Sequence, residues 1–345
     1  MSNEKSALRL LPADLTSDRP ALVELFRRCL SPTFSERRFD WLYRKSPFGP
    51  ARAWVLSVEA TQKVIGAGAA FRRHMYIGGV ERIGCVLADF CVVPEYRSLG
   101  PSLKLQRALV KAAQEEFEFF YDFPSRSMLA IYERLAILQS GQIVRWAKLL
   151  RSEQKLTAMV RNRRLARVAA TVVDPFLGRK PRTGPYDIEV HEGACEEEFT
   201  RFDQQLPKTS GIRTVRNADY LNWRYLQAPD EAFRVLTARQ KGQLKGYAVC
   251  AVGSDHGAIT DLCAADDPTV VRSLLDASIA HLRTEGASVV VLNAVSSHPW
   301  SEEFRRVGFS QRDASPFIAF VKPGAGIPAD TFLTRWYGMR GERDS

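Results

Sequence analysis

The feature that most limits how this chain can fold is an internal repeat. Residues FDWLYRKSPFGP at 39–50 align with LNWRYLQAPDEA at 221–232, so that Trp41 corresponds to Trp223 and Pro47 to Pro229. At 345 residues the chain is also longer than one hydrophobic core usually supports. Both observations predict two domains built as copies of one folding unit.

A second pair of segments extends the repeat at a constant offset. ADFC at 88–91 aligns with TDLC at 260–263, and the same offset of 172 carries Tyr132 onto Phe304 without a gap. The predicted organisation is a first copy at 1–150, a basic connector at 151–184, a second copy at 185–325 and a C-terminal tail at 326–345.

Residues 82–117 predict a buried strand, a short turn and a helix. The run from Cys85 to Val93 is apolar except for Asp89, as in an interior strand covered on both faces, and Pro94 ends it. From Leu103 onward, apolar residues recur at helical spacing with basic residues between them. The turn that joins the strand to the helix is therefore held between two regular elements.

This turn, Arg97 to Ser102, is a candidate phosphate site. Several backbone N–H groups would point at one spot, and the start of the helix adds its positive dipole end, so a diphosphate fits there. Gly100 allows close approach, and we expect Pro101 at the first helical position, where a missing N–H costs nothing. The six residues taken alone also fit an ordinary strand-to-helix turn.

In its context, VVPEYRSLGPSLKLQRAL at 92–109 resembles the acyl-CoA loop of the GCN5-related N-acetyltransferase superfamily. Arg97 and Gly100 match the pattern of that loop, whereas Ser102 stands where Gly or Ala is usual and Pro101 removes one amide. The resemblance implies an α/β (α+β) fold class, in which each copy is a mixed, mainly antiparallel sheet flanked by helices.

The resemblance also implies an acyl-CoA-dependent N-acetyltransferase, with acetyl-CoA or another acyl-CoA as co-substrate and no metal. The residues that it places at the donor are Val92, Val93, Arg97, Ser98, Leu99, Gly100 and Ser102. Tyr132 occupies the place of the tyrosine that many members use as general acid, and a packed aromatic residue is the equal alternative.

Asp89 interrupts an apolar strand, where burial of a carboxylate is costly without partners. It is a candidate base or an anchor for the acceptor. The alternative is a hydrogen-bonded structural residue, which Asp261 favours because the second copy keeps the acid. At the loop the second copy has changed: Thr269, Arg272 and Leu274 replace Arg97, Gly100 and Ser102. We therefore expect that only the first copy binds CoA.

The net charge of +10 is concentrated in one segment. Residues 145–182 carry eleven Lys or Arg and two acids, with apolar residues between them in an amphipathic pattern. Such a segment can be a solvated connector, can contact an anionic membrane surface, or can bind RNA phosphates, and nucleic acid is the least favoured of the three. Six cysteines without metal-ligand spacing and the absence of a signal-peptide pattern predict a cytoplasmic protein, with peripheral contact to the inner membrane as an option.

The tandem copies, YLNWRYLQAP at 220–229 and, more loosely, the tail from Trp336 to Asp344 also resemble bacterial double-domain acetyltransferases of cell-surface polysaccharide synthesis. That resemblance implies a sugar amine or hydroxyl as the acceptor. Two alternatives remain open at this point. One is a Fem-like aminoacyltransferase that uses aminoacyl-tRNA, and the other is a non-catalytic binding protein in which both copies have decayed.

Overall fold

A computed structural model describes residues 7–137, 140–151, 184–207, 211–253 and 256–343. The predicted basic connector lies almost entirely outside these residues, as do the proposals for membrane or RNA contact that depend on it. In the part of the chain that the structure describes, no helix is long and apolar enough to cross a membrane.

The first copy begins with strand, helices and antiparallel strands, and continues with the predicted strand-turn-helix. Its elements are β1 (Leu8–Pro12), α1 (Arg19–Cys29), α2 (Glu36–Phe39), the π-helix η1 (Asp40–Arg44), β2 (Arg52–Val58), β3 (Val64–Ile77), β4 (Val80–Val92), the 3-10 turn η2 (Pro94–Tyr96), α3 (Leu99–Glu116), β5 (Phe119–Asp122), α4 (Arg126–Arg134) and β6 (Gly141–Leu149).

The second copy repeats this order. Its elements are β7 (Asp187–Val190), α7 (Glu197–Gln205), β8 (Ile212–Thr214), α8 (Ala218–Leu221), the π-helix η3 (Asn222–Leu226), β9 (Phe233–Gln240), β10 (Gln243–Val252), β11 (His256–Ala264), α9 (Pro268–Thr284), β12 (Val289–Val295), α10 (Ser301–Arg306) and β13 (Ser310–Val321). The tail adds α11 (Thr331–Thr334) and the 3-10 turn η4 (Arg340–Glu342).

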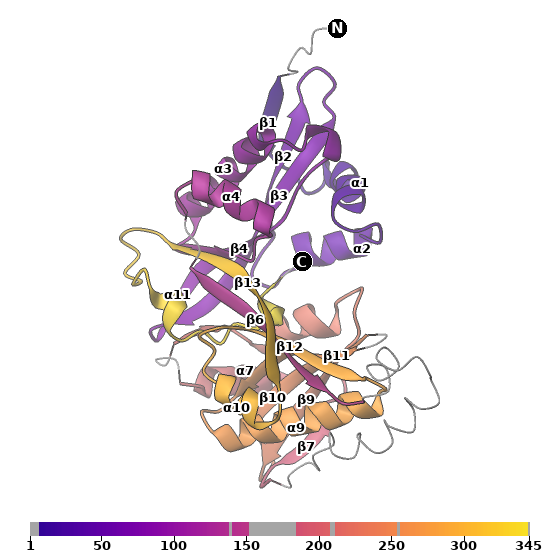
Figure 1. Ribbon diagram of the computed structural model, residues 1–345, viewed down its shortest axis with the longest axis vertical. Helices are drawn as coiled ribbons and strands as arrows, with labels where there is room; N and C mark the ends of the chain where they lie inside the picture. The colour runs from indigo at the N-terminus through magenta and orange to yellow at the C-terminus, as the bar shows by residue number, and fades with distance from the viewer. Residues whose placement is uncertain (1–6, 138–139, 152–183, 208–210, 254–255, 344–345) are drawn as a thin grey trace.

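One continuous sheet joins the two copies, in the order β1-β2-β3-β4-β5-β13-β6-β12-β11-β10-β9-β7, with β8 beside β3. The two copies exchange their last strands at the centre of this sheet. β6 pairs with β12 of the second copy, and β13 pairs with both β5 of the first copy and β6. Figure 1 shows β6 and β13 crossing between the upper and lower halves of the molecule. The proposed boundary at 150 therefore divides the sequence copies, while the hydrogen bonds cross it.

The repeated segments also meet face to face. Trp41 and Trp223 stack with 5.3 Å between ring centroids. Each indole nitrogen donates a hydrogen bond to the backbone carbonyl of the other tryptophan, at 2.6 Å from Trp41 and 2.9 Å from Trp223. Both residues lie in a one-turn π-helix that follows a short capped helix. The internal repeat is thus a structural pseudo-symmetry whose two halves bind each other.

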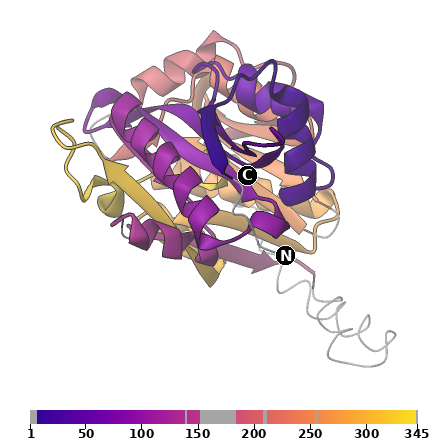
Figure 2. The ribbon, with the colours of Figure 1, turned by 90° about the horizontal axis from the view of Figure 1, so that it is seen from above.

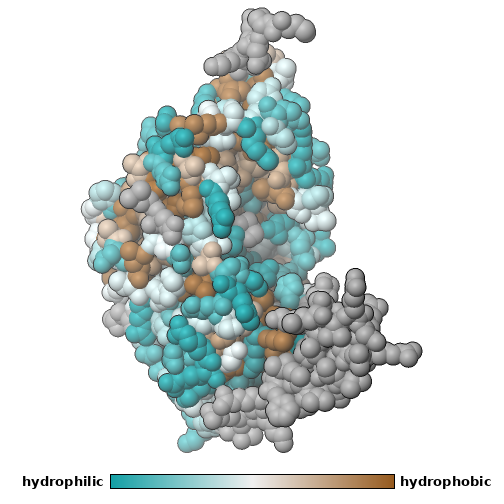
Figure 3. All heavy atoms as spheres, viewed as in Figure 1, coloured by the Kyte–Doolittle hydropathy of each residue, from teal (hydrophilic) through white to brown (hydrophobic). Residues whose placement is uncertain are grey.

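Three groups of buried side chains form the core. One is shared, because it contains buried residues of both copies on the side of α1, α2, α7 and α8. A second packs under α9 in the second copy, and a third packs under α3 and α4 in the first. Figure 2 shows helices on both faces of the twisted sheet. On the face in Figure 3, apolar side chains occur singly or in small groups. The predicted α/β fold class is confirmed.

One local prediction needs correction. Helix α3 begins at Leu99, after the N-cap residue Ser98, so the helix starts four residues before Leu103 and Pro101 occupies its third position instead of its first. Proline is still tolerated there because the first four amides of a helix have no partner within the helix. The consequence is that Leu99 and Gly100, rather than Ser102, supply the first amides of the helix.

Candidate functional site

A bulge in β4 opens the sheet of the first copy. The register between β3 and β4 pairs Ala67 with Cys91 and Ala69 with Ala88, so Asp89 and Phe90 together face one residue of β3. Asp89 adopts a left-handed backbone with φ of 53°. Extra residues of this kind bend a strand and often lie beside active sites. The bulge therefore turns β4 away from its neighbour at the residue that the sequence singled out.

Strands β4 and β5 separate at this bulge. Their parallel pairing runs from Gly84 opposite Phe119 to Leu87 opposite Asp122 and stops there. Beyond it a cavity of about 690 Å³ opens. Its walls include residues 29–31, 33 and 34 at and after the end of α1, residues 88–90 of β4, and residues 122–125 at and after the end of β5. A ligand can therefore reach the gap between the two strands.

Asp122 lies at the opening of the strands and lines the cavity. The hydroxyl of Tyr132 on α4 donates a hydrogen bond of 2.6 Å to its Oδ2. Burial raises the pKa of Asp122 to about 6, against the opposing effect of that hydrogen bond. Tyr132 itself is fully buried, and burial followed by the charge of Asp122 raises its pKa well above the ordinary value. Tyr132 thus reaches the cavity through Asp122.

Asp89 also lines the cavity, although only 5% of it is exposed. The hydroxyl of Tyr43 in η1 donates a hydrogen bond of 2.9 Å to its Oδ2. Tyr43 is completely buried, and burial ahead of the charge of Asp89 raises its pKa well above the ordinary value. Both predicted catalytic residues therefore belong to Tyr–Asp pairs at one cavity, and each pair places a carboxylate at the cavity wall.

The predicted donor loop lies at the end of β4, with residues 97–100 exposed. Ser98, at the N-cap of α3, makes no side-chain capping bond. A Cβ added at Gly100 would have no atom within 4 Å. The start of α3 is therefore an uncapped helix N-terminus with free space in front of it, which is the geometry that anionic groups favour.

The other predicted donor residues contribute less. Val92 and Val93 are buried in the core, 3% and 2% exposed, and the Val92 carbonyl accepts a bond of 3.3 Å from Arg97 Nε. Ser102 is 8% exposed, and its amide already donates to the Ser98 carbonyl at 3.3 Å. Only backbone atoms of the two valines could face a ligand, and the Ser102 side chain is directed into the protein.

Cys29 lies where the loop and the cavity meet. It lines the cavity, and Arg97 and Arg28 are close enough to act on its charge. A hydrogen bond with the Cys91 thiol, ahead of the effects of these arginines, lowers the pKa of Cys29 to about 7. The same bond and burial raise the pKa of Cys91 well above its ordinary value. A thiolate can therefore form at the cavity near neutral pH.

The far wall of the cavity comes from distant parts of the chain. Asp230 of the second copy and Arg343 of the tail both line it. Asp230 accepts a hydrogen bond of 3.3 Å from Arg38, another cavity residue. The guanidinium of Arg343 lies 5.5 Å from the ring centroid of Phe123. The cavity of the first copy is thus completed by the second copy and the C-terminal tail.

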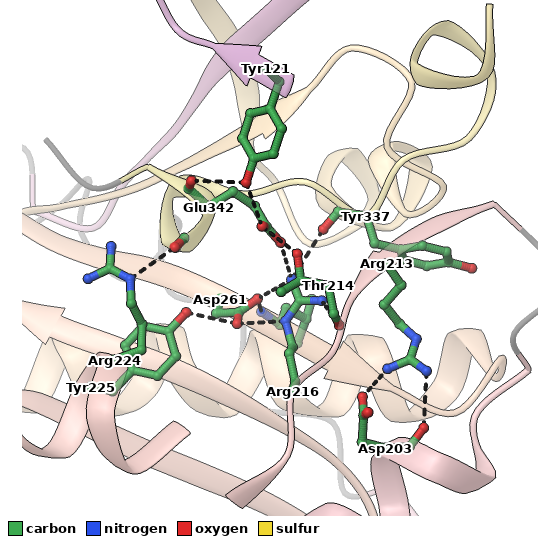
Figure 4. A network of polar contacts seen from close by, with 12 residues as sticks. Tyr121, Asp203, Arg213, Thr214, Arg216, Arg224, Tyr225, Asp261, Tyr337 and Glu342 are labelled. Carbon is green, nitrogen blue, oxygen red and sulfur yellow. Dashed lines mark hydrogen bonds and ion pairs between the residues drawn. The ribbon is translucent and has the colours of Figure 1, made fainter. Parts of the chain in front are cut away.

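The corresponding place in the second copy is filled. Asp261, the counterpart of Asp89, accepts a bond of 2.8 Å from Tyr225 and forms an ion pair of 2.9 Å with Arg216. Arg216 also pairs with Glu342 of the tail at 2.9 Å. Figure 4 shows the three charged groups converging, with Tyr225 and Thr214 beside them. Each of these three side chains is at most 2% exposed.

The start of the corresponding helix in the second copy, α9, is also occupied by a side chain of the protein. Asp267 caps α9, accepting a hydrogen bond of 2.8 Å from the Thr269 amide and one of 2.6 Å from the Tyr186 hydroxyl. The constant offset of 172 fails here: Gly100 is the second residue of α3, and the second residue of α9 is Thr269, not Arg272. Arg272 lies further along α9 and forms an ion pair of 3.3 Å with Glu303. A carboxylate thus occupies the place where a diphosphate would bind.

Four residues that matter here were not predicted from the sequence: Asp122, Cys29, Asp230 and Arg343. Asp122 had a local signal, because a carboxylate ends the apolar strand Phe119–Asp122 directly beside β4. Asp230 and Arg343 had none, since each reaches the cavity through tertiary packing. Among the described residues, no group of three His, Cys, Asp or Glu side chains could hold a metal ion.

No family model and no curated protein matches this sequence. Solved structures do resemble it. A probable N-acyltransferase from Enterococcus faecalis V583 aligns over 91% of this chain and 72% of its own, at 11% identity and a TM-score of 0.64. A GCN5-related N-acetyltransferase from Anabaena variabilis ATCC 29413 covers 91% and 73%, at 16% identity and a TM-score of 0.65.

N-myristoyltransferase of Saccharomyces cerevisiae, solved with bound myristoyl-CoA, also resembles the chain. It covers 92% of this chain and 84% of its own, at 12% identity and a TM-score of 0.58. All three similarities extend over both copies, so the whole tandem arrangement is shared. The chain has the fold of the GCN5-related N-acetyltransferase superfamily, as its sequence predicted.

Proposed function

We propose that this protein is an acyltransferase that moves an acetyl or other acyl group from acyl-CoA to an amine, using the cavity of the first copy. The observation that carries the proposal is the separation of β4 and β5 at the Asp89 bulge. That opening faces a cavity of about 690 Å³ lined by two carboxylates of the first copy. The fold neighbours support the reaction class, because they include named acetyltransferases and a protein solved with bound myristoyl-CoA.

The donor would bind at the start of α3. Its diphosphate would accept hydrogen bonds from the amides of Leu99 and Gly100, and the helix dipole would stabilise its charge. Arg97 extends from the same turn and lies near Cys29 at the cavity. The pantetheine arm would then enter the gap between β4 and β5, which places the thioester beside Asp89 and Asp122.

Asp122 is the group best suited to move protons. With a pKa of about 6 it is ionised at neutral pH and remains basic enough to accept a proton from an attacking amine. The nitrogen attacks the thioester carbonyl, its proton passes to Asp122, the C–S bond breaks, and protonated Asp122 returns the proton to the CoA thiolate. Tyr132, predicted as the acid, would act through its hydrogen bond to Asp122, and Asp89 would anchor the acceptor.

An amino sugar is the acceptor that the sequence resemblance favours. The mixture of carboxylates and guanidinium groups around the cavity supports a polar acceptor, because a sugar presents hydroxyls to both. Transfer to a sugar hydroxyl uses the same proton path. Glucosamine and its N-acetylated product make a suitable first assay pair.

Acetyl-CoA binding tests the proposal directly. A ligand that binds only the folded protein raises the melting temperature, so acetyl-CoA should stabilise the wild type. Gly100→Asp should abolish the shift by placing a carboxylate at the helix start, whereas Thr269→Asp, at the same second position of α9, should keep it. The absence of a shift at millimolar acetyl-CoA would refute the proposal, and a salt-sensitive shift with tRNA alone would favour the Fem-like alternative.

A further inference from the structure

The C-terminal tail is locked between the two copies. Glu342 is 1% exposed and binds Arg216 at 2.9 Å and the Thr214 hydroxyl at 2.5 Å. Gly341 packs so closely that a Cβ there would lie 2.2 Å from the Tyr225 hydroxyl. Figure 4 shows Glu342 reaching the charged cluster of the second copy. The site of the second copy therefore holds a segment of its own chain.

Arg224 binds the backbone of the tail on both sides of Glu342. Its side chain is 8% exposed and donates to the Gly341 carbonyl at 3.0 Å and to the Arg343 carbonyl at 2.5 Å. Three consecutive residues, Gly341 to Arg343, are thus held from the second copy. Because the backbone of Arg343 is anchored in this way, its side chain projects from a fixed point toward the first copy, where it lines the cavity.

The guanidinium of Arg343 is placed for an anion. It lies 5.5 Å from the centroid of Phe123, and its Nε is buried without a hydrogen-bond partner among the described residues. Burial lowers the pKa of Arg343, and the nearby Asp122 opposes that effect. A buried N–H donor without an acceptor costs free energy, and a bound anion would satisfy it. Arg38, the other cavity arginine, already pairs with Asp230 at 3.3 Å.

We propose that Arg343 is a specificity residue of the acceptor site, which the tail delivers to the first copy, and that it binds a carboxylate or phosphate group of the acceptor. The carboxylates of Asp89 and Asp122 line the same cavity and would attract the amine. The acceptor would then carry an anionic group in addition to the amine, as a phosphorylated amino sugar or an amino acid does. Calling the bound molecule an acceptor rests on the proposed function, whereas the test of anion binding at Arg343 does not depend on it.

The test measures anion binding in the absence of any acyl donor. Both arms carry Gly100→Asp, so that phosphate does not bind at the start of α3. Inorganic phosphate, and in a parallel series acetate, is titrated at constant ionic strength, and the dissociation constant is measured by calorimetry. Arg343→Gln should weaken binding about tenfold or more, as expected when a charge-assisted hydrogen bond is lost. Arg340→Gln, on the same tail but paired with Glu231, should bind like the parent.

Each outcome decides the matter. Loss of binding in Arg343→Gln alone supports the inference, and the stronger of the two anions identifies the group recognised. The inference is overturned if the Gly100→Asp parent binds neither anion, or if Arg343→Gln binds them as the parent does. The change in melting temperature with acetyl-CoA is measured separately on the wild-type protein. Failure of the donor site and failure of the anion site are therefore distinguished.

Discussion

The two copies hold the same Tyr–Asp pair in different surroundings. In the first copy Tyr43 donates to Asp89, and in the second Tyr225 donates to Asp261, at 2.9 and 2.8 Å. In each copy a short helix, α2 or α8, leads into the tyrosine, and the residue before the N-cap of that helix is Phe34 in the first copy and Arg216 in the second. Phe34 lines an open cavity, whereas Arg216 and Glu342 fill the equivalent space. The Tyr–Asp pair is therefore a structural feature of both copies. The residues that face the pair distinguish the open site from the filled one.

The Asp122–Tyr132 pair belongs to the first copy alone. Strand register places Leu292 opposite Ile259 where the first copy has Asp122 opposite Leu87. The constant sequence offset places Phe304 at Tyr132. Both replacements are apolar and buried in the second copy. The second copy folds with hydrophobic residues at these two places, so the fold itself does not require the polar pair. A role of the pair in the reaction explains its presence in the first copy better than a role in folding.

The largest expected effect concerns that pair. Asp122→Asn should lower kcat/KM by about 10² to 10⁴ because the proton acceptor is lost. The wild-type rate should rise with pH to about 6 and then level, since the pKa of Asp122 is about 6 and only its ionised form accepts a proton. Rates are measured from pH 5 to 8 with acetyl-CoA and the best amine found. If Asp122→Asn keeps the pH profile of the wild type, a group other than Asp122 accepts the proton.

The second prediction concerns the filled site. Arg216→Met should lower the free energy of unfolding by about 3 to 5 kcal/mol, because it leaves Asp261 and Glu342 buried without their cation. Urea denaturation measures this change. Phe34→Met, the matched substitution in the first copy, should cost less than about 2 kcal/mol, since it exchanges one apolar side chain for another beside an open cavity. Equal losses would remove the distinction between the two sites.

The third prediction uses stability to test the pKa of Asp122. Its pKa rises from 3.8 to about 6 on folding, so the folded protein binds the proton more tightly. This contribution to stability is complete below pH 3.8 and is lost as pH rises through 6. Relative to Asp122→Asn, the wild type should lose up to about 3 kcal/mol between pH 4 and pH 7. Urea denaturation of both proteins across that range gives the difference, and a constant difference would show that folding does not shift this pKa.

The smallest effect concerns Cys29. Its pKa is lowered to about 7, which favours the thiolate near neutral pH, and it lies at the cavity, whereas the other five cysteines are buried. Iodoacetamide should therefore modify Cys29 first, as peptide mass spectrometry can show. Acetyl-CoA should slow this reaction if it binds beside Arg97. Faster modification of Cys263, in the filled site, would indicate that the second copy opens.

The sequence by itself determined the tandem repeat, the fold class and the turn at Arg97, because these depend on local periodicity and on residue types at short spacing. It also proposed Asp89 and Tyr132 as candidate site residues, which line or adjoin the cavity, although their partners Tyr43 and Asp122 were not predicted. The start of α3 was misplaced because Pro101 fits any of the first helical positions.

Only the tertiary structure decided how the cavity is completed. The exchange of β6 and β13 brings the copies together, and the tail carries Arg343 to within reach of Phe123, 220 residues away in sequence. Nothing in the local pattern of the tail predicts this position. It depends on Arg216 and Arg224, which bind the tail where the second copy has lost its cavity. Contacts of this kind come from the packing of distant segments, which residue spacing does not encode.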